Sequence, residues 1–166
     1  MKATLGTQLR HLIELLDGAV EASYAEAGLN YRPRYTPVLR ALLADEPLTV
    51  GQIAERAGIT QPAATQTVAL MIREGLLTSE AGAQDARQKM VRLSEAGRAM
   101  VPRLRQCWQA TATAAASLDA QLPYPLSQAL ANAIEALDGQ SFGTRIRAAR
   151  EAQEAQQAQQ AASRQG

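Results

Sequence analysis

Cysteine, histidine and aromatic residues are scarce in this sequence of 166 residues. The single cysteine, Cys107, cannot form a disulfide within the chain, and with the single histidine, His11, it cannot complete a zinc site. Long apolar runs are also missing: no segment approaches the roughly 20 consecutive apolar residues of a membrane helix, and the N-terminus lacks the apolar core of a signal peptide. These absences favour a cytoplasmic protein with neither a metal nor another cofactor.

Apolar residues nevertheless make up 46% of the chain, whereas aromatic residues contribute only 4%. Much of the apolar fraction is alanine, which favours closely packed helices over an aromatic-rich sheet. The sequence has no nucleophile near a base, no metal cluster and no phosphate-binding glycine loop at usable spacing, so it does not suggest an enzyme. A mainly α fold with a binding function is the prediction.

The distribution of charge is uneven although the formal net charge is only +1. Residues 50–105 contain eight basic and five acidic side chains, whereas the rest of the chain has nine basic and eleven acidic ones. A locally basic segment is a feature of domains that bind nucleic acid.

Apolar spacing and capping residues predict a series of helices. The stripe from Leu5 to Tyr24 is typical of an amphipathic helix, and Thr36 with Pro37 predicts the N-cap and first residue of the next one. Thr49 with Gln52 makes a capping box for a third helix. The expected core faces are Val38, Leu39, Leu42 and Leu43, then Ile53, Ala54 and Ala57.

The third helix is followed by a glycine turn at Gly58 and by a fourth helix that Thr60 caps. Pro62 is tolerated there because amides in a first turn have no intrahelical partner, and Gly75 ends the helix. Val68, Met71 and Ile72 are expected to face the core. Two short helices joined by a glycine turn form a helix-turn-helix, whose second helix fits the major groove of DNA.

An alternating pattern after Gly75 predicts a small β-hairpin, or wing. Residues 76–78 are the first strand, residues 81–84 the tip, and Lys89, Val91 and Leu93 the return strand. Ser94 then caps a long helix with a narrow apolar seam, and a further helix is expected from Leu126 to Leu137. Beyond Ala148 the chain is nearly all Ala, Gln, Glu and Arg, which predicts a solvated helix or a disordered tail.

In order and spacing, these motifs resemble the MarR family of transcription regulators. The resemblance is carried by Leu48-Thr49-Val50-Gly51-Gln52-Ile53-Ala54, Ala57-Gly58-Ile59-Thr60-Gln61, Glu74-Gly75-Leu76-Leu77, Asp85-Ala86-Arg87 and Val91-Arg92-Leu93-Ser94-Glu95-Ala96-Gly97. It implies a winged helix-turn-helix at residues 33–98, dimerisation helices at 1–32 and 99–142, and a tail at 143–166. A homodimer would then place two recognition helices in successive major grooves, about 34 Å apart, on a pseudo-palindromic operator.

The resemblance also implies the residues that meet double-stranded DNA. These are Thr60, Gln61, Pro62, Ala63, Thr65 and Gln66 at the base-reading end of the recognition helix, Asp85 and Arg87 at the wing, and Arg73 and Lys89 at the phosphates. Glutamine pairs bidentately with adenine, threonine offers a hydroxyl and a methyl, and a guanidinium suits a narrow minor groove.

This chain departs from the family at three positions where an arginine is frequent, namely Gln66, Leu70 and Ser79. Fewer cations imply a gentler salt dependence of DNA binding, by a slope of about 0.9 for each lost phosphate contact. The serine at position 79 leaves Asp85 without the arginine that usually accompanies it in the family.

Small-molecule control is common in the resembling family, and Tyr24, Tyr31, Tyr35, Arg40 and Trp108 are the residues expected to line an effector cleft. Each also fits an ordinary place in the core or at its rim. Cys107 is either a redox sensor or, as a buried helix cysteine usually is, an inert apolar residue. The alternative function from another class is a winged-helix adaptor that binds a protein partner and no DNA.

Overall fold

The structure is a computed structural model that describes residues 4–82 and 88–163, with side chains described as far as residue 160. Its elements, in chain order, are α1 (Leu5–Glu26), the 3₁₀ turn η1 (Pro33–Tyr35), α2 (Thr36–Ala44), α3 (Val50–Ala57), α4 (Gln61–Arg73), β1 (Leu77–Ala81), β2 (Lys89–Leu93), α5 (Glu95–Gln121), α6 (Leu126–Gly139) and α7 (Phe142–Ser163). The predicted fold class, mainly α with a small β-wing, is confirmed.

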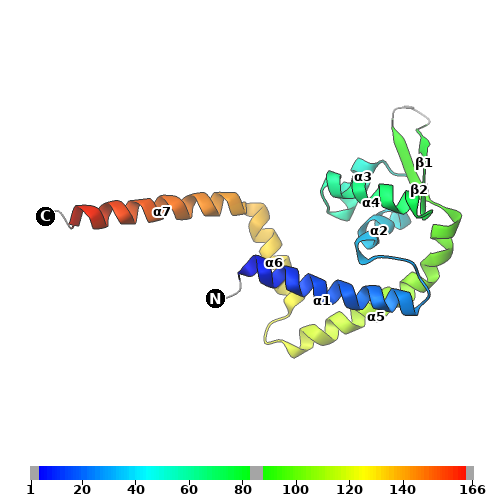
Figure 1. Ribbon diagram of the computed structural model, residues 1–166, viewed down its shortest axis with the longest axis horizontal. Coiled ribbons are helices and arrows are strands. Elements are labelled where there is room, and N and C mark those ends of the chain that lie inside the picture. Colours follow the sequence, from blue (N-terminus) through cyan, green and yellow to red (C-terminus); the bar gives the residue numbers. More distant parts are fainter. Residues whose placement is uncertain (1–3, 83–87, 164–166) are drawn as a thin grey trace. The chain divides into compact units, whose positions relative to one another are not determined.

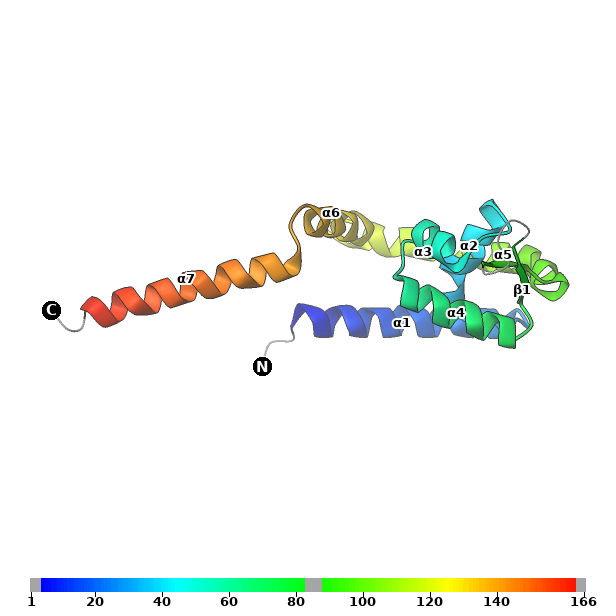
Figure 2. The same cartoon turned by 90° about the horizontal axis from the view of Figure 1, so that it is seen from above.

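The chain divides into two compact units, residues 1–112 and 113–166. In the first unit α2, α3 and α4 pack against one another, and the β1–β2 hairpin follows the end of α4 (Figure 1). The second unit contains α6 and α7, which are separate helices joined at a bend (Figure 2). The alanine- and glutamine-rich segment is therefore helical as far as Ser163.

The helix-turn-helix is built by the local signals that the sequence carries. Thr49 and Gln52 form a reciprocal capping box: the amide of Gln52 donates to Thr49 Oγ1 at 3.2 Å, and the amide of Thr49 donates to Gln52 Oε1 at 2.9 Å. Gly58 ends α3 with a φ of 64°, a left-handed conformation that glycine adopts without strain. Both predictions are confirmed.

One helix start and one core position differ from the sequence-based expectations. Thr36 is the first residue of α2 and Tyr35 its N-cap, because η1 leads directly into the helix. Ile72 was expected in the core but is 36% exposed. The buried stripe of α4 consists of Ala64, Thr67, Val68 and Met71, and a residue eight positions after Ala64 has rotated past the edge of that stripe.

The hairpin is antiparallel and is held at its base by a third segment of chain. Leu77 pairs with Leu93 and Ala81 with Lys89, so β1 runs three residues beyond the predicted end of its strand. Leu48 forms an isolated bridge with Val91, with the two amides donating to the opposite carbonyls at 3.0 and 2.8 Å. The turn before α3 is thereby joined to the wing.

Candidate nucleic-acid interface

One face of α4 is free of the core along its whole length. Thr60 caps the helix, and its Oγ1 accepts a hydrogen bond from the amide of Ala63 at 3.4 Å. The exposed side chains on this part of the helix are Gln61, Pro62, Ala63, Thr65, Gln66 and Ala69, followed by Arg73 in the last turn. The six predicted base-reading residues, which begin with the cap Thr60, are thus brought together on one exposed surface.

Cations of the first unit differ in whether an acid neutralises them. Within the described residues, the ion pairs join Arg32 to Glu74 at 3.3 Å, Arg56 to Asp45 at 2.8 Å, Arg92 to Glu80 at 4.0 Å, and Arg98 to Glu46. Arg73 and Lys89 are exposed and occur in none of those pairs. Their charges are therefore available to an anionic partner such as a phosphate backbone.

The wing residues Asp85 and Arg87 lie outside the described residues. All three positions at which the family often carries arginine are described, however, and Gln66 is exposed on α4. Leu70 is partly buried and packs against the core, and Ser79 pairs with Val91 in the hairpin register. At Leu70, therefore, an apolar core contact replaces a surface cation.

Glu46 has a positioning role that sequence reasoning missed. One of its carboxylate oxygens accepts a hydrogen bond from the amide of Leu93 at 2.9 Å, and the other pairs with Arg98. The carboxylate thus joins the loop after α2 to the end of β2 and the start of α5. Its only sequence signal is an acid before Pro47, which is too common in loops to be informative.

The predicted effector residues also lie close together, but mostly inside the core. Tyr24, Tyr31 and Tyr35 are buried, and Tyr31 contacts the other two rings edge to face, at centroid distances of 5.1 and 5.6 Å. Trp108 Nε1 donates to the hydroxyl of Tyr24 at 3.1 Å, and the guanidinium of Arg40 lies 4.9 Å from the centroid of the Trp108 ring.

The hydroxyl groups of Tyr31 and Tyr35 are buried without a hydrogen-bond partner among the described residues. Burial raises the pKa of Tyr31 well above its ordinary value, because the ionised phenolate would lose its hydration there. Tyr31 therefore acts as a neutral core residue at physiological pH.

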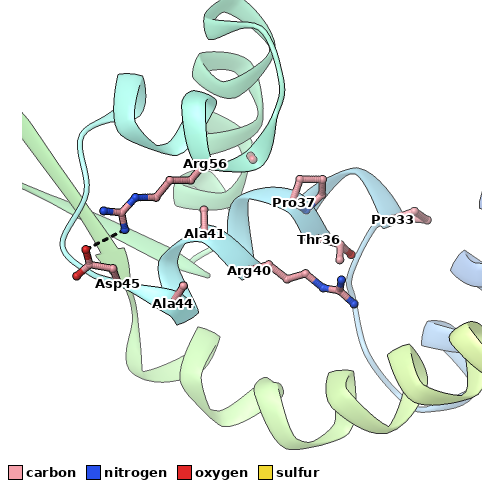
Figure 3. Close-up of a pocket in the computed structure, with 9 residues that line it drawn as sticks. Pro33, Thr36, Pro37, Arg40, Ala41, Ala44, Asp45 and Arg56 are labelled. Carbon is pink, nitrogen blue, oxygen red and sulfur yellow. Dashed lines mark ion pairs between the residues drawn. The ribbon is translucent and has the colours of Figure 1, made fainter. Parts of the chain in front are cut away.

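An open cleft of about 730 Å³ lies along α2 and α3. Its lining comprises Pro33, Thr36, Pro37, Arg40, Ala41, Ala44, Asp45, Arg56 and Ala57, so Arg40 is the one predicted effector residue that it includes. Figure 3 shows Arg56 reaching to Asp45 while Arg40 extends away from that pair. The cleft is of a size that small molecules occupy.

Two further findings concern the described parts of the chain only. None of the helices there is long and apolar enough to cross a membrane. Nor do three or more His, Cys, Asp or Glu side chains gather there in a group that could hold a metal ion.

Cys107 is a buried free thiol, 8% exposed.

Comparison with known proteins identifies the domain. Residues 27–88 match the model of the MarR family. The fold is similar to that of the Mycobacterium tuberculosis transcriptional regulator MosR in complex with DNA, with a TM-score of 0.66 and 22% identity over 84% of this chain and 100% of that one. No curated protein sequence matches significantly.

Two other solved structures are similar over most of the chain. The Staphylococcus aureus MepR–DNA complex has a TM-score of 0.64 and 20% identity, covering 83% of this chain and 99% of that one. The Streptomyces coelicolor regulator PcaV with its natural ligand has a TM-score of 0.58 and 23% identity, covering 85% and 99%. Residues 27–88, which include the helix-turn-helix, are therefore similar to the MarR family, and the fold is that of solved transcription regulators.

Proposed function

We propose that this protein is a sequence-specific repressor that binds double-stranded DNA as a homodimer on a pseudo-palindromic operator. The observation that carries the proposal is the free face of α4, which is capped at its N-terminus and ends at Arg73, an exposed cation that no described acid neutralises. An exposed helix of this width fits the major groove, and Arg73, like the exposed Lys89 of β2, suits the phosphates. MosR and MepR, whose folds are similar, were solved with DNA.

The roles of individual residues follow from their places. Thr60, Gln61, Pro62, Ala63, Thr65 and Gln66 approach the base edges, and Arg73 and Lys89 contact phosphates. Asp85 and Arg87 belong to the wing, and Arg87 enters the minor groove. Because the family's arginine is replaced at Gln66, Leu70 and Ser79, the affinity depends on salt less steeply than it would with all three.

The homodimer is supported by apolar side chains that the chain leaves uncovered. In α1 these are Leu5, Leu9, Ile13 and Leu16, and in the second unit they include Leu130, Ile134, Leu137 and Phe142. Apolar stripes of this extent are unusual on a monomer, and a second copy would cover them. The proposed division of the chain is therefore two dimerisation segments, 1–32 and 99–142, around a DNA-binding domain at 33–98, with a tail at 143–166.

A small-molecule effector completes the proposal. The open cleft beside Arg40 and the solved complex of PcaV with its natural ligand support it. Because Tyr24, Tyr31 and Tyr35 lie in the core beneath Trp108, we propose that they shape the wall behind an effector, whereas Arg40 contacts it. The protein then acts in the cytoplasm, where bacterial DNA is found, by binding and release rather than by catalysis.

The test is selection from a pool of random duplexes at two salt concentrations, followed by sedimentation of the complex with a selected duplex. We expect a pseudo-palindrome, two chains per duplex and weaker binding at the higher salt. Arg73→Ala should lower the salt slope by about 0.9 per chain, and Arg10→Ala, an exposed change in α1, should leave it unchanged. Absence of binding even at low salt would instead indicate a winged-helix adaptor for a protein partner.

A further inference from the structure

We infer that α4 reads A·T base pairs, and that Thr65 reads thymine through its methyl group. This inference rests on the proposed function, because it assumes that the free face of α4 enters the major groove. It goes further by assigning the bases that this face selects and the atom with which one side chain selects them.

The first observation is the absence of charge on the reading part of the helix. From Gln61 to Ile72 no side chain of α4 is charged, and Arg73 stands in the last turn. Guanine presents two acceptors, N7 and O6, in the major groove, and bidentate arginine or lysine is the usual partner for them. This helix therefore lacks the side chains best suited to guanine over its first three turns.

The two glutamines have the complementary chemistry for adenine. Gln61 and Gln66 are exposed, and each carboxamide carries one donor group and one acceptor. Adenine offers N7 as an acceptor and N6 as a donor, so the amide pairs with it bidentately. Opposite guanine, the amide carbonyl would face O6 without a donor between them, which costs part of that interaction.

Thr65 is restricted by a contact within its own helix. Its Oγ1 donates to the carbonyl of Gln61 at 2.9 Å, so the hydroxyl proton is already engaged. The side chain is exposed and its hydroxyl has no proton left to donate to a base, so the methyl group is its means of apolar contact with one. The C5 methyl of thymine is the apolar group in the major groove that such a methyl can contact.

Two exposed alanines extend the apolar part of this surface. Ala63 and Ala69 are exposed on α4, as Thr65 and Gln66 are. Alanine methyls also make apolar contact with thymine. Amides for adenine and methyls for thymine thus cover the reading face, and both select the same base pair.

The test uses a duplex taken from the selection described above. In that duplex each thymine of a half-site is replaced in turn by deoxyuridine, which removes only the C5 methyl. We expect A·T pairs at the positions facing α4, and at one of them a loss of affinity of about four-fold, the effect of one buried methyl group. Thr65→Ser should abolish the difference at that position and keep the differences at the others.

A matched control and a second variant keep the outcome clear. Thr7→Ser, at an exposed threonine of α1, should leave every thymine–deoxyuridine difference unchanged. Gln66→Arg should move the selected base at its position from adenine to guanine. Selection of G·C pairs by the wild-type helix, or equal binding of thymine and deoxyuridine at every position, would overturn the inference and leave the proposed function standing. Failure to bind any duplex would overturn both.

Discussion

The helix-turn-helix and the C-terminal unit differ in how they use apolar residues. Every residue of the buried core lies in the first 112 residues, with Tyr35, Val38, Ile53 and Met71 completely inaccessible. Between residues 113 and 160 no described side chain is buried, and Ile134 is 61% exposed. The helix-turn-helix therefore covers most of its own apolar surface, whereas the C-terminal unit, like the first part of α1, displays it.

This difference separates folding from association. The helix-turn-helix and its hairpin, called the lobe below, cover their own core. They can therefore hold α4 in position, because the packing that fixes the helix is internal. A helix that exposes a stripe of Leu and Ile gains most of its stability when another surface covers that stripe. The same apolar substitution should therefore have different effects in the two regions.

The largest expected effect is from a cavity in the self-contained lobe. Ile53→Ala removes a completely buried side chain and should lower the free energy of unfolding of this lobe by about 2 to 5 kcal/mol. Ile134→Ala, in exposed α6, should leave the unfolding of the lobe nearly unchanged and weaken self-association. Urea unfolding and sedimentation measure the two effects, and equal losses of stability would contradict the contrast.

A smaller effect is expected from adding one methyl group at a glycine. A Cβ at Gly97 would lie 2.2 Å from the carbonyl oxygen of Leu76, so Gly97→Ala should destabilise the lobe by about 1 to 3 kcal/mol. At Gly18, inside α1, a Cβ would meet nothing within 4 Å, and Gly18→Ala should stabilise that helix by about 0.5 to 1 kcal/mol. Thermal unfolding should shift in opposite directions, and the same sign for both variants would be inconsistent with this packing.

The smallest effect compares two threonine caps. Thr49→Ala breaks the capping box of α3 and should cost the lobe about 1 kcal/mol, because the amide of Gln52 loses its acceptor, Thr49 Oγ1. Thr4→Ala removes the cap of α1, where the amide of Thr7 donates to Thr4 Oγ1 at 3.2 Å. Since the first turns of α1 are exposed, that change should reduce helicity without moving the unfolding midpoint of the lobe. An equal shift of the midpoint in Thr4→Ala and Thr49→Ala would show that the start of α1 and the lobe unfold together.

Most of the helix-turn-helix could be predicted because its signals are local. Thr49, Gly58 and Thr60 act within three or four residues of themselves, and each does in the structure what its type and spacing predict. The prediction that Ile72 lies in the core was wrong because burial is not a local property. A residue at the edge of an apolar stripe is buried only if a neighbouring element covers it. The contact of Glu46 with Leu93 spans 47 residues and had no local signal.

The candidate interface was predictable in membership and unpredictable in detail. Spacing alone placed Gln61, Thr65 and Gln66 on one part of a helix, because a helix fixes which residues share a face. The tertiary structure decided how far the free face extends, since Ala64, Val68 and Met71 are buried and Ile72 is not. The direction of the Thr65 hydroxyl also needed coordinates, because an exposed threonine has more than one rotamer in a helix.

By itself the sequence determined the caps and the glycine turn of the helix-turn-helix and which chemistry α4 can present. Caps, glycine turns and the identity of a side chain are properties of residues and their close neighbours. The tertiary structure decided that Tyr24, Tyr31 and Tyr35, the tyrosines predicted to line an effector cleft, are buried. It also decided that Arg40 lines an open cleft. Burial is a property of everything that surrounds a residue, and distant parts of the chain supply those surroundings.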